Sequence, residues 1–233
     1  MTLLLFGLFF LFMLLGVPIA FAIGASTLYA LYQSGVPLMV VTQQMFQGIN
    51  SFALVAIPMF ILAGDLMAQG KVSERLVSFA DSLVGFMRGG LSVVSVMAGM
   101  FFAAISGSGA ATTAAVGSSL VPELKRKGYD PASAASLIAA SGTIGVVIPP
   151  SVPMIIYAVI AQQSVSELFL NGFLPGLAMG VALMAIAITQ AYKRQYPKGT
   201  PLSLATMWHT FKAASWGLMT PVIILGGIFS GIF

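Results

Sequence analysis

Long apolar stretches with few or no charged residues alternate with short polar segments along the whole chain. The stretches are residues 3–31, 52–67, 91–124, 131–164, 173–192 and about 216–233. Apolar runs of about 18 residues or more are typical of helices that cross a bilayer. The pattern therefore predicts an all-α polytopic membrane protein, in which the first stretch makes one crossing that is kinked at Pro18.

The third stretch is interrupted halfway by the segment Ser106-Gly107-Ser108-Gly109. The arms on either side, residues 91–105 and 110–121, are each too short to cross a hydrocarbon core of about 30 Å at about 1.5 Å per residue. We expect two short helices that fold back on each other as a re-entrant hairpin. The alternative is a single spanning helix.

The fourth stretch contains two consecutive prolines, Pro149 and Pro150. Proline removes a backbone donor and disfavours helix in the residue before it. We predict a discontinuous helix with half-helices at residues 131–141 and 153–163, and we expect the break to pack against the hairpin tip. Secondary transporters bind ions and substrates at such breaks near the membrane midplane.

The ten Lys and Arg residues fall into three clusters, at residues 71–88, 125–127 and 193–212. If residues 91–124 enter and leave on one face, all three clusters lie in the cytoplasm, as the positive-inside rule requires. The N-terminus is then cytoplasmic, and the uncharged loop 32–50 lies outside. A single spanning helix would instead place the first two clusters on opposite faces.

Composition excludes several classes of function. Charged residues make up 7% of the chain and hydrophobic residues 58%, and there is no cysteine. A membrane-embedded enzyme would need an acid/base pair or an activated nucleophile, so we expect neither an enzyme nor a cofactor. The basic residues lie in short loops, which argues against nucleic acid. The lone His209 suits an interfacial position, and Asp65 is either a proton-coupling carboxylate or a solvated helix end.

The two interruptions supply the oxygen atoms that a sodium site needs, since unwound backbone carbonyls coordinate Na⁺ in transporters. The predicted sodium-binding residues are Ser106, Gly107, Ser108, Gly142, Thr143, Gly145, Ile148 and Pro150. Half-helix amino ends could meet a substrate carboxylate. The predicted substrate-binding residues are Ser108, Gly109, Thr112, Pro149 and Ser151. The alternative role for such Gly and Ser residues is close helix packing.

Three segments resemble the large membrane subunit (the DctM type) of TRAP, or tripartite ATP-independent periplasmic, transporters. Residues 58–64 resemble its second helix, residues 105–129 its first hairpin, and residues 140–151 its broken helix. The likeness covers essentially the whole chain, and its most specific part is Ile148-Pro149-Pro150-Ser151.

The resemblance implies an elevator-type symporter of the bacterial inner membrane. Such a symporter uses Na⁺ as the coupling ion to take up an organic acid, such as a C4-dicarboxylate or sialic acid. Its partners would be a small four-helix membrane subunit and a periplasmic substrate-binding protein. The implied Na⁺ ligands are Ser106, Ser108, Gly145, Ile148 and Pro150. The alternatives are a membrane scaffold or passive channel subunit, and a dicarboxylate or citrate carrier that uses no binding protein.

The resemblance also predicts how the chain is organised. Residues 1–88 would be scaffold-like, residues 89–165 transport-domain-like, and residues 166–233 further membrane helices. Members of the family carry a second, inverted repeat, so we expect the missing second half of the large subunit to be a further partner, beside the lipid bilayer.

Overall fold

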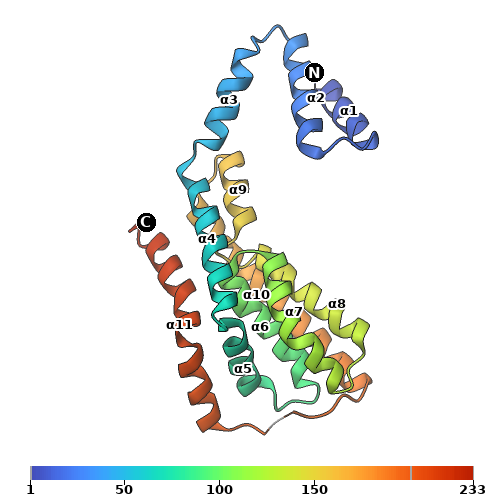
Figure 1. Ribbon diagram of the computed structural model, residues 1–233, viewed down its shortest axis with the longest axis vertical. Coiled ribbons are helices and arrows are strands. Elements are labelled where there is room, and N and C mark those ends of the chain that lie inside the picture. Colours follow the sequence, from blue (N-terminus) through green and yellow to red (C-terminus); the bar gives the residue numbers. More distant parts are fainter. Residues whose placement is uncertain (1, 200, 233) are drawn as a thin grey trace. The chain divides into compact units, whose positions relative to one another are not determined.

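The computed structural model describes residues 2–199 and 201–232, which are largely helical and form no β-strand (Figure 1). Two helices, α10 (Val165–Lys193) and α11 (Leu204–Phe229), are each long and apolar enough to cross a membrane. This confirms the prediction of an all-α polytopic membrane protein. Its contacts divide the chain into two compact units, Met1–Ser51 and Phe52–Phe233.

The first unit begins with a helical hairpin. Helices α1 (Thr2–Leu14) and α2 (Ile19–Gln33) pack against each other. Gly16 lies between them at a φ of +79°, a left-handed conformation that glycine adopts without strain. Pro18 then caps the start of α2. The prediction of one crossing kinked at Pro18 is therefore wrong, because the chain reverses direction at Gly16.

Helix α3 (Met39–Ile49) occupies most of the segment that we predicted as the loop 32–50. Pro37 precedes it, and Asn50 follows it as its C-cap. None of the described residues of α3 is buried. The charge pattern showed that this segment is uncharged, but it could not show that the segment is helical.

The second unit is built around α6, of which thirteen residues are buried. Helices α5, α7, α8 and α10 all pack against α6 (Figure 1). The elements of this unit other than α10 and α11 are α4 (Phe52–Gln69), α5 (Val72–Val84), α6 (Gly90–Ser106), α7 (Gly109–Arg126), α8 (Pro131–Thr143), the 3₁₀ turn η1 (Ile144–Val146) and α9 (Val152–Ala161).

The predicted hairpin and the predicted break both form. Helix α6 ends at Ser106, Gly107 reverses the chain at a φ of +60°, and α7 starts at Gly109 and packs back against α6. Helix α7 is longer than expected, because it continues through Pro122 to Arg126. The fourth stretch is divided into α8, η1, an irregular segment and α9. The face from which the hairpin enters the membrane stays a prediction.

The segment after α10 is attached to the start of α8. The guanidinium of Arg194 lies 3.0 Å from the carboxylate of Asp130, and the Tyr196 ring packs on Tyr129 with centroids 4.1 Å apart. Asp130 also accepts a 2.9 Å hydrogen bond from the Ser133 amide at the start of α8. The bonds from Ser133 and then Arg194 hold the pKa of Asp130 below its ordinary value of 3.8.

Helices α10 and α11 both start earlier than the apolar runs indicated, at Val165 and at Leu204. Their first turns carry polar residues, which hydropathy alone assigns to loops. Each helix is capped by a serine, Ser164 or Ser203, whose hydroxyl accepts a hydrogen bond from a first-turn amide.

The predicted division of the chain into scaffold-like and transport-domain-like parts, at residues 88 and 165, stays a prediction.

Candidate ion and substrate site

The hairpin tip is docked on the start of α9. The amide of Gly107 donates to the carbonyl of Ala103, and the carbonyl of Gly107 accepts a 3.0 Å hydrogen bond from the amide of Val152. A Cβ atom on Gly107 would lie 2.7 Å from the carbonyl oxygen of Pro150, closer than real Cβ atoms approach oxygen. The tip therefore needs glycine here, and the expected packing of tip against break is observed.

Three oxygen atoms meet just behind the tip and form what we call the oxygen cluster: Ser106 Oγ, Thr112 Oγ1 and the Ser108 carbonyl oxygen. The two hydroxyls lie 2.9 Å apart, and the Thr112 hydroxyl donates to the Ser108 carbonyl at 2.8 Å. Ser106 is 2% exposed and Thr112 0%. A Cβ on Gly145 would lie 2.9 Å from Thr112 Oγ1 and 3.1 Å from the Ser108 carbonyl oxygen, so η1 closes over the cluster.

A second close contact joins α7 to α8. A Cβ on Gly142 would lie 3.0 Å from the Gly109 carbonyl oxygen and would overlap the Thr113 hydroxyl. A Cβ on Gly109 would lie 2.9 Å from the Gly142 carbonyl oxygen. Two glycines thus allow the backbone carbonyls of the tip and of the broken helix to approach each other.

The amino end of α9 has no free amide in its first turn. The Val152 amide is bonded to Gly107, Pro153 has no amide hydrogen, and the Met154 amide donates to the Ser151 hydroxyl at 3.4 Å. Ser151 is itself buried and donates to the Val146 carbonyl at 2.6 Å. Ser151 therefore works as a helix cap inside the fold.

The amino end of α7 differs from that of α9. Ser108 caps α7 by accepting from the Ala111 amide at 3.4 Å. The amides of Gly109 and Ala110 donate to no partner in the described part of the chain. Both residues are at least partly exposed, and their two backbone donors, which have no described partner, lie beside the oxygen cluster.

Three further predicted residues make no described contact with the oxygen cluster. Thr143 is exposed, and its hydroxyl donates to the Ala140 carbonyl of its own helix at 2.7 Å. Ile148 packs against Gly176 of α10, where an added Cβ would lie 3.4 Å from the Ile148 nitrogen. Pro149 is buried. Their assignment to ion or substrate binding stays a prediction.

A pocket of about 350 Å³ lies between α4, α6 and α7, beside the tip. Its polar side chains are Asp65, Ser106 and Ser108, and the remaining lining residues are Ile61, Gly64, Phe102, Ala111, Ala114 and Ala115. The Asp65 carboxylate, on the exposed side of α4, thus shares a pocket with the hairpin tip. Hydropathy placed Asp65 only near a helix end, because it cannot show which helix face meets the hairpin.

Comparison with known proteins decides the family. Residues 6–233 match the family described as "Tripartite ATP-independent periplasmic transporter, DctM component". The chain belongs to this family. The resemblance found in its sequence is therefore confirmed.

Among the similar TRAP proteins, the isethionate TRAP transporter permease protein DctMQ of Oleidesulfovibrio alaskensis is 46% identical over 98% of this chain. The C4-dicarboxylate TRAP transporter large permease protein DctM of Rhodobacter capsulatus is 39% identical over 100% of it, and the 2,3-diketo-L-gulonate TRAP transporter large permease protein YiaN of Escherichia coli is 42% identical over 94%. The aligned regions make up 36%, 56% and 52% of these three relatives, so this chain spans only part of their length.

The sequence located the TRAP-family hairpin tip. Thr112, which we predict to bind substrate, lies buried within the oxygen cluster. Its assignment to substrate stays a prediction. Thr113 was not predicted at all, although it lies against Gly142 and donates to the Gly109 carbonyl at 2.9 Å. The available signal was helical spacing, which places Thr112 and Thr113 one turn after Ser108 and Gly109.

Proposed function

We propose that this chain forms one wall of the binding site of a TRAP transporter that couples Na⁺ to the uptake of an organic anion. The observation that carries the proposal is the buried oxygen cluster of Ser106, Thr112 and Ser108 at the docked hairpin tip. The chain would lie in the bacterial inner membrane with its N-terminus in the cytoplasm. A small membrane subunit, a periplasmic binding protein and a second repeat would complete the transporter.

The chemistry of the oxygen cluster suits a hard monovalent cation. It contains two hydroxyls and one carbonyl, so it is rich in lone pairs but carries no net charge. If the hydroxyl hydrogens rotate outward, all three oxygens can face one ion. The described residues hold no group of three His, Cys, Asp or Glu side chains that could bind a different metal. Unwound backbone beside a half-helix is the usual place for coupling ions in secondary transporters.

The open amino end of α7 suits the carboxylate or other acidic group of the substrate. The amides of Gly109 and Ala110 are unpaired in the described structure, and the helix dipole favours negative charge there. Ser108 belongs to both places, since its carbonyl is in the oxygen cluster and its hydroxyl caps α7. Binding of Na⁺ at the oxygen cluster would therefore stabilise the conformation of Ser108 that substrate binding at the amino end of α7 needs, and the reverse.

The names of the relatives support an anionic substrate, because isethionate, C4-dicarboxylates and 2,3-diketo-L-gulonate are all organic acids. No described Lys or Arg lines the pocket beside the tip, so helix amides would have to neutralise the substrate's charge.

Removal of one hydroxyl from the oxygen cluster tests the proposal. The transporter that contains this chain is reconstituted in liposomes with its binding protein, and uptake is measured against Na⁺ concentration. Ser106→Ala and Thr112→Ala should each raise the half-saturating Na⁺ concentration, by roughly 5- to 150-fold if one lost ligand costs about 1–3 kcal/mol. Thr112→Ser keeps the hydroxyl and should restore the dependence. Ser136→Ala is the matched control, since the Ser136 hydroxyl is exposed and donates to the Ser133 carbonyl of its own helix.

Unchanged Na⁺ dependence in both alanine variants would assign these hydroxyls to helix packing and remove the sodium site from this position.

A further inference from the structure

An open apolar groove of about 530 Å³ lies between α5 and the first turns of α11. Its lining residues are Phe79, Leu83, Leu204, Met207, Trp208 and Phe211. The two helices pack together here, and the Ser82 and Thr210 hydroxyls lie 2.9 Å apart between them. Leu204 is 72% exposed and Trp208 60%, so large apolar side chains of the groove face the surroundings.

Three basic residues lie on or close in sequence to the two helices that line this groove. Lys212 Nζ lies 5.2 Å from the centroid of the ring of Trp208, which lines the groove. The backbones of Arg88, shortly after α5, and Lys198, shortly before α11, lie side by side in an isolated antiparallel bridge. The Nε of Arg88 is buried and has no described hydrogen-bond partner. We call Arg88, Lys198 and Lys212 the basic rim.

The charge of the basic rim is not balanced by acidic residues. None of its three cations forms an ion pair in the described part of the chain, where the ion pairs join Glu123 to Arg126 and Lys127, and Asp130 to Arg194. Burial raises the pKa of Asp81, the acidic residue of α5 closest in sequence to the rim, and the charges that act on this carboxyl are those of Lys127 and Glu123. The rim therefore attracts anions.

The apolar lining of the groove and the cations of the basic rim together indicate an occupant that has both an apolar part and an anionic group. A free phosphate would need the cations but not a groove lined by leucine, methionine and aromatic rings. An uncharged lipid would fill the groove but would not use the cations. Helix α11 is long and apolar enough to cross a membrane, and its amino-terminal turns, which carry Trp208 and Lys212, are the part expected near the headgroups. Basic pockets between helices at this level suit anionic headgroups.

We propose that the groove binds one anionic phospholipid of the leaflet that faces the basic residues. Its acyl chain lies between α5 and α11, and its phosphate lies at Lys212 with Arg88 and Lys198 close to the headgroup. The lipid would touch the inner core through Phe79, whose ring packs against Phe101 of α6 at 5.9 Å and against Phe211 of α11 at 5.6 Å. Bound lipid would thus brace the helix pair that supports the hairpin arm α6.

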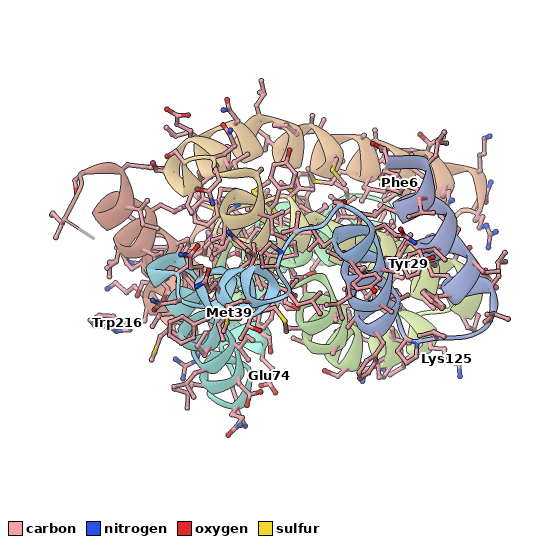
Figure 2. The ribbon with its side chains drawn as sticks, turned by 90° about the horizontal axis from the view of Figure 1, so that it is seen from above. Phe6, Tyr29, Met39, Glu74, Lys125 and Trp216 are labelled. Atoms are coloured by element: carbon pink, nitrogen blue, oxygen red, sulfur yellow. The ribbon has the colours of Figure 1, made fainter. Side chains whose placement is uncertain are left out.

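The two tryptophans of the chain allow a direct test, since Trp208 lines the groove and Trp216 is 80% exposed and points outward (Figure 2). In a Trp216→Phe background, Trp208 is the single tryptophan. The full chain is placed in nanodiscs with increasing fractions of phosphatidylglycerol or phosphatidylcholine carrying brominated acyl chains. Bromine quenches tryptophan on contact, so half-maximal quenching reports occupancy of the groove.

Brominated phosphatidylglycerol should quench Trp208 at a much lower fraction than brominated phosphatidylcholine. Each cation near the headgroup contributes about fivefold to that preference, so three give roughly a hundredfold. Lys212→Gln should lower the preference about fivefold, and the triple Gln variant of the basic rim should remove it. Lys212→Arg should keep it. Lys125→Gln is the matched control, because Lys125 is an exposed cation at the far end of α7 (Figure 2).

Equal quenching by the two lipids, or a full preference in the triple variant, overturns the proposal. A change in Trp208 emission with inorganic phosphate, without any preference between the lipids, also overturns it and assigns the rim to a free anion. Retained preference in Lys212→Arg shows that a loss in Lys212→Gln comes from charge and not from misfolding.

Discussion

The addition of a single methyl group at Gly107 tests how strongly the hairpin tip stabilises the docked position of the broken helix. Gly107→Ala adds a Cβ at a φ of +60°, 2.7 Å from the Pro150 carbonyl oxygen and 3.4 Å from the Val152 nitrogen. Gly128→Ala adds the same group at a φ of +81° with no atom within 4 Å. Both changes impose left-handed backbone strain on alanine, and only the first pushes the tip away from its docking site.

The expected magnitudes follow from this geometry. Left-handed backbone costs a residue with a Cβ about 1–2 kcal/mol, which applies to both variants. Gly107→Ala must also shift the tip against backbone, and overpacking of that kind costs about 1–3 kcal/mol. The shift weakens the hydrogen bond from Val152 to Gly107. At roughly 2–4 °C per kcal/mol for a chain of this size, Gly107→Ala should melt about 2–12 °C below Gly128→Ala.

Thermal unfolding of the purified chain in detergent gives the two melting temperatures, and hydrogen exchange locates the effect. The Val152 amide should exchange faster in Gly107→Ala than in the wild type, whereas Gly128→Ala should leave it unchanged. Equal melting temperatures for the two variants, together with normal protection of Val152, would show that the tip does not hold the break.

Two further predictions concern the Asp130 carboxylate and the membrane topology. Asp130→Asn should lower the melting temperature, and this deficit relative to wild type should disappear in acid. The folded-state pKa of Asp130 lies below 3.8, so the stabilisation by its carboxylate is present above pH 3.8 and is lost as the pH falls through the lowered value. Arg194→Gln should lower the melting temperature less, because the hydrogen bond from Ser133 to Asp130 remains. If the deficit of Asp130→Asn persisted in strong acid, the Asp130 carboxylate would not be its cause. For topology, the sequence has no native cysteine, so single cysteines can be introduced and labelled. Ser34→Cys and Gln43→Cys should react with an impermeant reagent from outside, whereas Arg88→Cys and Lys127→Cys should not. Labelling of positions 88 and 127 from opposite faces would rule out the re-entrant hairpin.

The sequence by itself determined the features that depend on local chemistry. Apolar runs set the class, because backbone groups in a bilayer must be satisfied within helices. The Ser106–Gly109 segment and the Pro149-Pro150 pair marked the tip and the break, because glycine and proline act on their own backbone and on their immediate neighbours. These features were therefore predictable to within a few residues.

Features that depend on which helix faces meet were decided by tertiary structure. Pro18 suggested a kink, but the reversal occurs at Gly16, where the packing of α1 on α2 selects a left-handed turn. Thr112 joined the oxygen cluster because α7 folds back over Ser106, and the amino end of α9 lost its free amide because the Gly107 carbonyl reached Val152. Hydrogen bonds of about 3 Å between separate helices depend on the packing of the whole unit, and no local pattern encodes that distance.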